Sequence, residues 1–323
     1  MPWIENAGLA TPWFFVGLFL AASFLMVWRL ESMAADGMEG TVLGTLIMPY
    51  CTGMGNLIFT IVLGMRGGSG ADVMTNCLVN NVTNLTLLVG LPAALWGMSG
   101  IPEKKVANCS HRLNRLAMLL TLFAVLFFTV TAWAMERHGE IGVAGGLVLI
   151  GLFLCWQAFH IFALLKTNRL EHKSFPRMLP VDLILLAAGA YATWLSTDWL
   201  VAWVSNIKTG GLISARYLGW LSGWLDVLPN GVLAFYYGWR RKAEVVYTSQ
   251  VGDGHICIPL CLGMFALYQP LKAPQGYQAG MIILLAAVLV HLVFIGMLGR
   301  LPRMIGWLLT AAYALFLYEG FGK

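Results

Sequence analysis

Apolar runs of about 20 residues follow one another along almost the whole chain, and they restrict its possible folds more than any other feature. A run of this length can cross the hydrocarbon core of a bilayer as an α-helix. In lipid, only helices and closed barrels satisfy every backbone N–H and C=O group. The runs lack the strict alternation of a lipid-facing β-strand. The sequence therefore predicts an all-α integral membrane protein with about ten transmembrane helices.

The expected spans lie at roughly 12–29, 41–65, 72–97, 115–135, 141–165, 180–204, 212–238, 245–268, 277–298 and 302–320. Composition agrees, with 59% hydrophobic and 11% charged residues and a mean hydropathy of +0.75. Soluble domains carry about 25% charged residues, so a soluble enzyme or nucleic-acid-binding domain is excluded. The first run, from Trp13 to Trp28, follows no positively charged segment. We therefore expect a retained span rather than a cleaved signal peptide.

Lysine and arginine residues gather in alternate loops between the predicted spans. One side of the membrane receives 14 of them and the other side 5, with Arg216 inside a span. Because cytoplasmic loops carry the excess of basic residues, ten spans place both termini outside. The net charge of +5 thus reflects membrane orientation, and no nucleic-acid partner is expected. Ten spans joined by short loops suit a bacterial inner membrane.

Two polar interruptions occur at matching places in the two halves of the chain. Residues 49–56 interrupt the second predicted span, and residues 226–231 interrupt the seventh. Each interrupted span is followed by one that begins with small and polar residues, at 75–84 and at 248–257. The two pairs are five spans apart, so the repeats insert in opposite orientations. Broken helices at matching positions of inverted halves indicate a transporter site near the bilayer midplane.

These segments resemble the α-repeats of the cation/calcium antiporter superfamily, which has the sodium/calcium exchanger fold. That family's repeat reads approximately GTSLPE, a basic-glycine turn, GNxxGSNxxN and an LGL-type apolar run. In the second repeat, residues 225–230 stand on the first motif and keep Leu228-Pro229, and residues 248–257 stand on the second motif and keep Gly252. In the first repeat, with one extra residue in the glycine turn, the corresponding segments are 51–56 and 75–84. Residues 197–201 resemble the family's Gly-Ala-Asp-x-Leu-Val element.

The resemblance implies two inverted five-helix repeats. The first half would occupy residues 1–165, with its α-repeat at about 41–97. The second half would occupy residues 166–323, with its α-repeat at about 212–268.

The glutamates that the resemblance implies as principal cation ligands are replaced. Asn56 and Asn230 stand where each GTSLPE motif ends in Glu. The last position of the second motif, Asn or Asp in the family, holds Asn84 and Cys257. Because Ca²⁺ prefers several hard oxygens, usually with carboxylates among them, classical Na⁺/Ca²⁺ exchange is not expected.

Two carboxylates remain near these positions, Asp226 and Asp253. An ionised carboxylate in mid-membrane is costly, so each should have a partner or a function; the expected partners are His255, Thr52 and each other. The predicted ion- or substrate-binding residues are Thr52, Asn56, Asn80, Asn84, Asp226, Asn230, Asp253 and Cys257. A purely structural role stays open, because polar residues also hydrogen-bond between packed membrane helices.

His255 is the candidate for proton coupling, because imidazole titrates near neutral pH. The cysteines at 51, 77, 257 and 261, with Met54, offer soft ligands for an ion such as Cu(I). Without a Cys-x-x-Cys spacing, we expect them to pack as small hydrophobic side chains instead. His160 and His291 lie in apolar runs whose spacing fixes no haem site. No metal centre and no cofactor are expected, apart from a bound monovalent cation.

Two functions of different classes fit these features. The first is a secondary antiporter for a cation other than Ca²⁺, or for a proton-coupled solute, whose partners are the lipid bilayer and a small cation or proton. The second is a non-transporting subunit or scaffold of exchanger fold, bound to partner subunits of a larger membrane complex. Loss of the glutamates favours the second function, and retention of two aspartates favours the first. An enzyme is not expected, because no nucleophile–base or metal-ligand set is visible.

Overall fold

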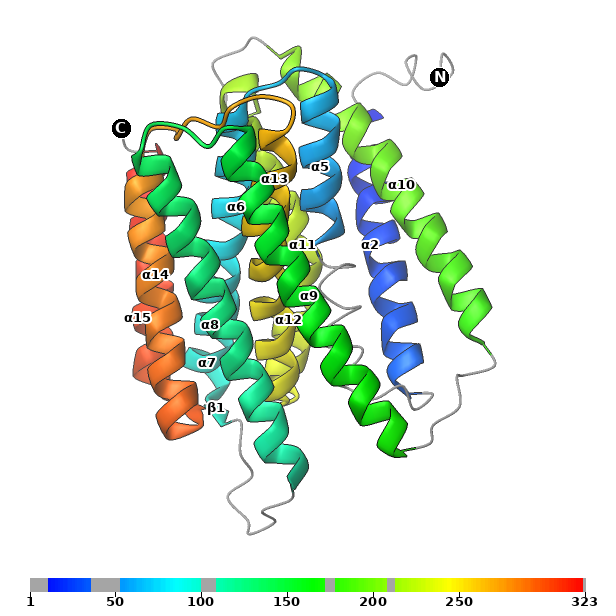
Figure 1. Ribbon diagram of the computed structural model, residues 1–323, viewed down its shortest axis with the longest axis vertical. Coiled ribbons are helices and arrows are strands. Elements are labelled where there is room, and N and C mark those ends of the chain that lie inside the picture. Colours follow the sequence, from blue (N-terminus) through cyan, green and yellow to red (C-terminus); the bar gives the residue numbers. More distant parts are fainter. Residues whose placement is uncertain (1–10, 36–52, 100–108, 172–177, 208–212, 322–323) are drawn as a thin grey trace.

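The computed structural model describes residues 11–35, 53–99, 109–171, 178–207 and 213–321, and nearly all of them are helical (Figure 1). The first half contains α2 (Thr11–Ala35), α5 (Met54–Met65), α6 (Gly70–Val82), the π-helical turn η3 (Thr83–Leu88), α7 (Val89–Trp96), α8 (Cys109–Arg137) and α9 (Val143–Glu171). The second half contains α10 (Leu179–Ser205), the 3₁₀ turn η4 (Ala215–Tyr217), α11 (Leu218–Trp239), α12 (Ala243–Ile256), the π-helical turn η5 (Cys257–Cys261), α13 (Leu262–Ala266), α14 (Tyr277–Val293), the π-helical turn η6 (Phe294–Leu298) and α15 (Arg303–Phe321). The strands β1 (Met98–Ser99) and β2 (Arg300–Leu301) form a short antiparallel pair.

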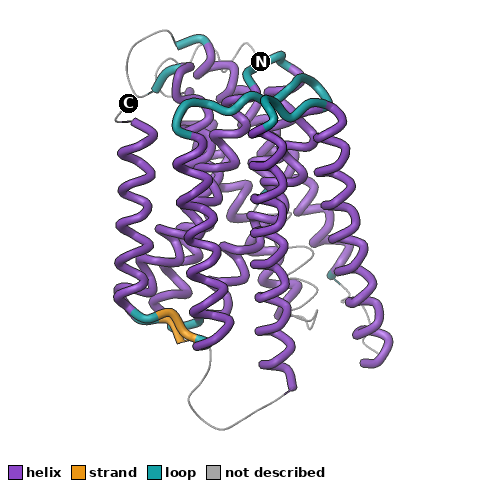
Figure 2. Tube along the Cα trace, turned by 60° about the vertical axis from the view of Figure 1, so that its left-hand side comes forward, coloured by secondary structure: helices purple, strands orange, loops and turns teal. Residues whose placement is uncertain are grey.

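The described helices form ten rods, because α6, η3 and α7 are continuous and so are α12, η5 and α13. Five described helices are long and apolar enough to cross a membrane, and three shorter ones are also apolar. Large apolar side chains such as Phe123, Leu147 and Ile184 lie exposed on the outer surface. The start of α2 and the end of α15 lie at one end of the bundle, and the β1–β2 pair lies at the other (Figure 2). This outer surface suits lipid as the solvent.

Close helix crossings repeat in the two halves and show their inverted relationship. Gly90 of α7 packs against Gly306 of α15, where an added Cβ on Gly306 would lie 2.6 Å from the Gly90 carbonyl oxygen. Gly146 of α9 packs in the same way against Gly263 of α13, where an added Cβ on Gly146 would lie 2.8 Å from the Gly263 oxygen. Small residues let membrane helices approach this closely. Each interrupted rod therefore packs against the last helix of the other half.

Helices α2 and α10 pack along one another and lie at one side of the bundle (Figure 1). Phe15 stacks on Trp199 with ring centroids 4.4 Å apart. Arg29 Nη1 lies 3.3 Å from Asp182 Oδ1, and the Asp182 side chain is only 1% exposed. This largely buried ion pair links α2 to α10.

We expect Asp182→Asn to destabilise the protein by about 3–5 kcal/mol, because it leaves the Arg29 charge buried without its partner. Thermal unfolding of the detergent-purified chain measures the loss. The matched control is Asp198→Asn, which removes a carboxylate that accepts from Arg66 at 2.7 and 2.9 Å. That pair is 42% exposed on both sides, so its loss should cost about 0–1 kcal/mol. Equal destabilisation by the two variants would contradict this account.

The predicted interruption of the seventh span is wrong. Helix α11 runs without a break from Leu218 to Trp239 and includes Pro229. The interruptions lie instead in the next rod of each half, at η3 and η5. The physical reason is proline, which lacks an N–H group and crowds the carbonyl four residues earlier: Pro92 follows the end of η3 by four residues, and Pro259 lies inside η5.

The first half of the predicted interruption at 49–56, residues 49–52, lies outside the described residues. Helix α5 begins at Met54 after Gly53, so Asn56 stands in the first turn of a helix. The structure therefore describes residues 53–56 of this segment, and the last three of them belong to α5.

Candidate functional site

Asp226 is buried on α11, facing α5 and α6. Asn76 of α6 donates from Nδ2 to Asp226 Oδ2 at 2.9 Å and to Ser222 Oγ at 3.0 Å. The other carboxylate oxygen packs directly on Gly55, where any Cβ would overlap it. Gly55 is the second residue of α5, so the carboxylate faces the positive end of that helix dipole. An asparagine and a helix N-terminus thus stabilise this acid inside the membrane.

Asp253 lies on α12 and is fully buried. Asn84, in the π-turn η3, donates from Nδ2 to Asp253 Oδ2 at 3.1 Å. Asn230 of α11 donates from Nδ2 to the same oxygen. The two carboxylates are near enough to interact electrostatically. Both acids belong to the second repeat, and an asparagine of the first repeat holds each of them.

Apart from Asn56, the amide groups at this site donate hydrogen bonds from their nitrogens and leave their oxygens without a donor. A carboxylate or a backbone carbonyl can only accept a hydrogen bond, so the amide nitrogen must face it. Asn81 donates to the Cys77 carbonyl at 2.7 Å, and Gln250 donates to the Asn230 carbonyl at 3.2 Å. Among the described residues around the site, seven buried amide oxygens accept no hydrogen bond: those of Asn56, Asn76, Asn80, Asn81, Asn84, Asn230 and Gln250.

Asn56 differs from the other amides because neither its oxygen nor its nitrogen has a hydrogen-bond partner among the described residues. The residue is fully buried in the first turn of α5. Only its backbone is engaged, since Thr60 Oγ1 donates to the Asn56 carbonyl at 2.8 Å. A buried polar group without a partner costs about 1–3 kcal/mol, so this side chain is suited to a ligand that supplies the missing contacts.

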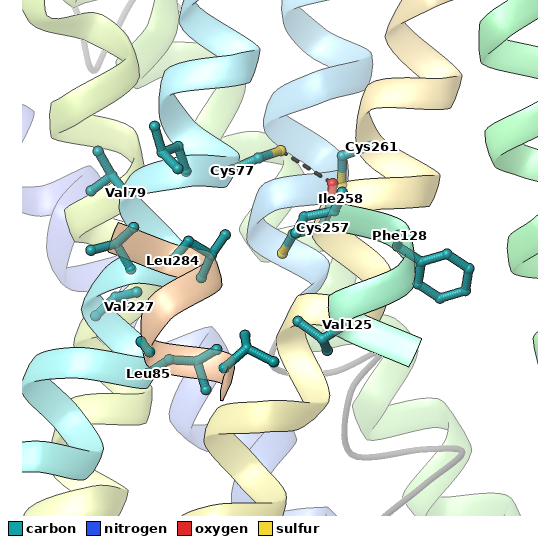
Figure 3. Close-up of a cluster of buried hydrophobic side chains, with 14 of the residues drawn as sticks. Cys77, Val79, Leu85, Val125, Phe128, Val227, Cys257, Ile258, Cys261 and Leu284 are labelled. Atoms are coloured by element: carbon teal, nitrogen blue, oxygen red, sulfur yellow. Dashed lines mark hydrogen bonds between the residues drawn. The ribbon is translucent and has the colours of Figure 1, made fainter. Parts of the chain in front are cut away.

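Thiols border the site on the α12 side. Asn80 donates from Nδ2 to Cys257 Sγ at 3.2 Å, and Cys77 donates to the Cys257 carbonyl at 3.3 Å (Figure 3). Cys261 is fully buried in the same cluster. In the described part of the chain, however, no group of three or more His, Cys, Asp or Glu side chains is arranged to hold a metal ion.

The structure brings most of the predicted residues together. Asn84, Asn230 and Asp253 form one hydrogen-bonded group, and Asn80 contacts Cys257. Asp226 is linked to the first repeat through Asn76. Asn56 shares the first turn of α5 with Gly55, which packs on Asp226. Thr52, predicted to bind the ion and to pair with the acids, lies outside the described residues.

Three amides at the site, Asn76, Asn81 and Gln250, were not among the predicted binding residues. Asn76 stands on the Asn of the GNxxGSNxxN motif, which was the signal available in the sequence. Asn81 stands on the second Asn of the same motif, whereas Gln250 falls on a variable position and carried no comparable signal.

His255, the proton-coupling candidate, is buried on α12 two residues beyond Asp253. Two residues correspond to roughly 200° around an α-helix, so the imidazole and the carboxylate leave the helix in different directions. Asn76 donates a hydrogen bond to Asp226, and Asn84 and Asn230 donate to Asp253.

The sequence profile of the sodium/calcium exchanger protein family matches residues 9–162 and 181–319, most of the chain. The chain belongs to this family. Sodium/calcium exchanger MaX1 of Methanosarcina acetivorans is 29% identical over 101 residues, which cover 31% of this chain and 27% of that protein. The match therefore spans only about a quarter of the relative's length.

Solved structures of the sodium-calcium exchanger NCX_Mj confirm the fold of this family member. The form soaked with Na⁺ and without Ca²⁺ has a TM-score of 0.66 at 19% identity, covering 94% of this chain and 95% of that one. A form soaked with Na⁺ and Sr²⁺ has a TM-score of 0.65 at 17% identity, covering 95% and 96%. The exchanger-like arrangement of inverted repeats in a membrane protein is thus confirmed, and the family is one of ion exchangers rather than enzymes.

Proposed function

We propose that this exchanger-family protein is a secondary antiporter for a small cation other than Ca²⁺. The observation that carries the proposal is the group of buried amide oxygens that accept no hydrogen bond around the hydrogen-bonded carboxylates Asp226 and Asp253. Most buried polar groups in proteins are hydrogen-bonded, so a local gathering of unused acceptors calls for a ligand. Because oxygens are the negative ends of their dipoles and two carboxylates lie among them, the site favours a positively charged ligand.

The chemistry of the donors favours a monovalent ion over a divalent one. Ca²⁺ sites use six to eight oxygens, usually with carboxylates among them. Here Asn56 and Asn230 replace the two glutamates that the family resemblance places in the site. One oxygen of each remaining carboxylate already accepts from an asparagine N–H group. Rings of neutral carbonyl oxygens, in contrast, are the ligands with which K⁺ filters replace an ion's hydration shell.

The position of the site between the two repeats supplies a mechanism for alternating access. Asn76 and Asn84 come from the first repeat, and Asp226 and Asp253 come from the second. All four residues are at least 95% buried, so the ion enters only when one repeat moves relative to the other. Movement of one repeat against the other around a central site is the general scheme for such transporters. A membrane orientation with both termini outside, in a bacterial inner membrane, belongs to this proposal.

We expect monovalent cations to stabilise the purified chain and Ca²⁺ to stabilise it much less. An ion at 100 times its Kd should add about 2.7 kcal/mol to the free energy of unfolding. Thermal unfolding would be measured with Na⁺, K⁺, Li⁺ and Ca²⁺ as chlorides, at constant ionic strength with a large organic cation as the control salt. Flux into proteoliposomes would then identify the coupling ion, with pH as a further variable.

The competing function, a non-transporting subunit, makes the opposite prediction. A partner that copurifies in fixed stoichiometry, together with no ion-dependent stabilisation, would show that the antiporter proposal is wrong. A larger response to Ca²⁺ than to any monovalent ion would contradict the proposed selectivity.

A further inference from the structure

The π-turn η3 leaves one backbone carbonyl without its usual place in the helix. Val89 directly follows η3. Its amide N–H donates to the carbonyls of Asn84 and Thr86 but not to that of Leu85, which lies between them. In a π-turn, each N–H donates to the carbonyl five residues earlier instead of four. Where the regular α-helix resumes, one carbonyl is left without a backbone donor. Leu85 directly follows Asn84, the residue that holds Asp253. The skipped carbonyl is thus one residue from the site.

His291 of α14 forms a hydrogen bond with the Leu85 carbonyl. Its Nε2 lies 2.7 Å from the Leu85 oxygen, and the histidine is fully buried. Because a carbonyl only accepts, Nε2 carries the hydrogen. Tyr247 of α12 packs against the imidazole with the rings near perpendicular and their centroids 6.0 Å apart. A rigid ring, held on one side by an aromatic neighbour, therefore donates to the turn that carries Asn84.

The second repeat shows the same device in a weaker form. In η5, the Cys257 carbonyl accepts from the Cys77 thiol at 3.3 Å. The π-turns η3 and η5 thus each accept a hydrogen bond from a side chain of another helix. A thiol is a weak donor, so the imidazole gives η3 the firmer attachment. No site residue lies on α14, and the histidine is its one hydrogen-bonded link to η3 among the bonds of the described residues.

We propose that His291 is a positioning residue that fixes the π-turn η3 in the register at which Asn84 faces Asp253. Its role in ion binding rests on the proposed cation transport, whereas its role in holding η3 does not. Without this donor, the Leu85 carbonyl loses its hydrogen-bond partner. The π-turn can then shift to a neighbouring position in the helix formed by α6, η3 and α7. Asn84 would then rotate away from the carboxylate.

The test uses His291→Leu, which removes the donor, and His291→Gln, whose amide N–H can reach the same carbonyl. Tyr247→Phe is the matched control, because it removes only a hydroxyl that has no hydrogen-bond partner among the described residues. Hydrogen exchange of the full-length chain in detergent reports on the amides of residues 83–92, with residues 303–321 as the internal reference. We expect His291→Leu to raise the exchange rate of residues 83–92 by about tenfold, which corresponds to about 1.4 kcal/mol. The other two variants should stay near the wild-type rate.

Cation titration of the same variants separates the two proposals. His291→Leu should raise the apparent Kd for the stabilising cation by about tenfold, and His291→Gln should restore it. If the wild-type chain responds to no cation, the proposed function fails, and hydrogen exchange alone decides the role of His291. Unchanged exchange at residues 83–92 in His291→Leu would overturn the inference. Equal acceleration in the Leu and Gln variants would also overturn it, because the effect would then come from packing.

Discussion

Asp253→Asn is expected to abolish cation transport while the protein still folds. The substitution keeps the shape of the side chain, and its oxygen can still accept from Asn84 and Asn230. What it removes is one of the two negative charges of the site. Removing one partner of a buried charge pair costs about 3–5 kcal/mol, so the rate of cation uptake should fall by about 100-fold or more at 1.4 kcal/mol per tenfold. Uptake into proteoliposomes, with the ion identified by the thermal screen, measures the fall.

The matched control for this result is Asp198→Asn. It also neutralises an aspartate of the second half, but that carboxylate is 42% exposed and pairs with Arg66. It should leave uptake within about twofold of the wild-type rate, because exposed ion pairs contribute little. Wild-type uptake by Asp253→Asn, with folding verified by thermal unfolding, would show that this carboxylate is not part of the ion path. Uptake lost in both variants would indicate a general effect of charge instead.

The sequence was sufficient to predict the class of fold, the number of rods and the inverted halves. Hydropathy alone defines apolar segments of membrane-spanning length, and the described helices begin and end close to the predicted spans. The place of the interruptions was predicted incorrectly. Pro229 suggested a break in α11, but a proline can lie within a continuous membrane helix when neighbouring groups satisfy the freed carbonyl. Pro259 and Pro92 were present in the sequence, yet whether a given proline produces a π-turn depends on the packing of the rod.

Residue types indicated which polar residues come together in the structure, but not the hydrogen bonds between them. The motif positions indicated Asn84, Asn230 and Asp253, which the structure joins in one group. The expected partners of the acids were His255, Thr52 and each other; the structure adds asparagine donors to both acids, and Thr52 lies outside the described residues. Sequence spacing places residues along a helix, whereas the choice of partner depends on how helices from the two repeats face each other. The unused oxygens could not be predicted either, because they appear only when each amide nitrogen has been assigned to its acceptor.

Gly55→Ala should reduce both stability and cation uptake, although it adds only a single carbon atom. An added Cβ at this position overlaps Asp226 Oδ1 and would lie 3.1 Å from the ring of Phe19. The carboxylate must therefore move, which weakens its hydrogen bond from Asn76. Crowding of this kind costs about 1–3 kcal/mol, and we expect cation uptake to fall by about tenfold or more at 1.4 kcal/mol per tenfold. Thermal unfolding and proteoliposome uptake measure the two effects separately.

The direction in which Gly55→Ala changes the free energy of unfolding separates crowding of the Asp226 carboxylate from the general effect of placing alanine in a helix. In a helix interior, glycine is less stable than alanine by roughly 0.5–1 kcal/mol, so Gly→Ala should stabilise a helix wherever space allows. Gly231 of α11 provides this control, because an added Cβ would lie 3.7 Å from Leu88, an ordinary contact. Gly231→Ala should therefore keep or raise stability, although it neighbours Asn230, and Gly55→Ala should lower it. If both variants stabilise the chain and transport normally, Asp226 has room to move, and the close fit between α5 and this carboxylate is not required for function.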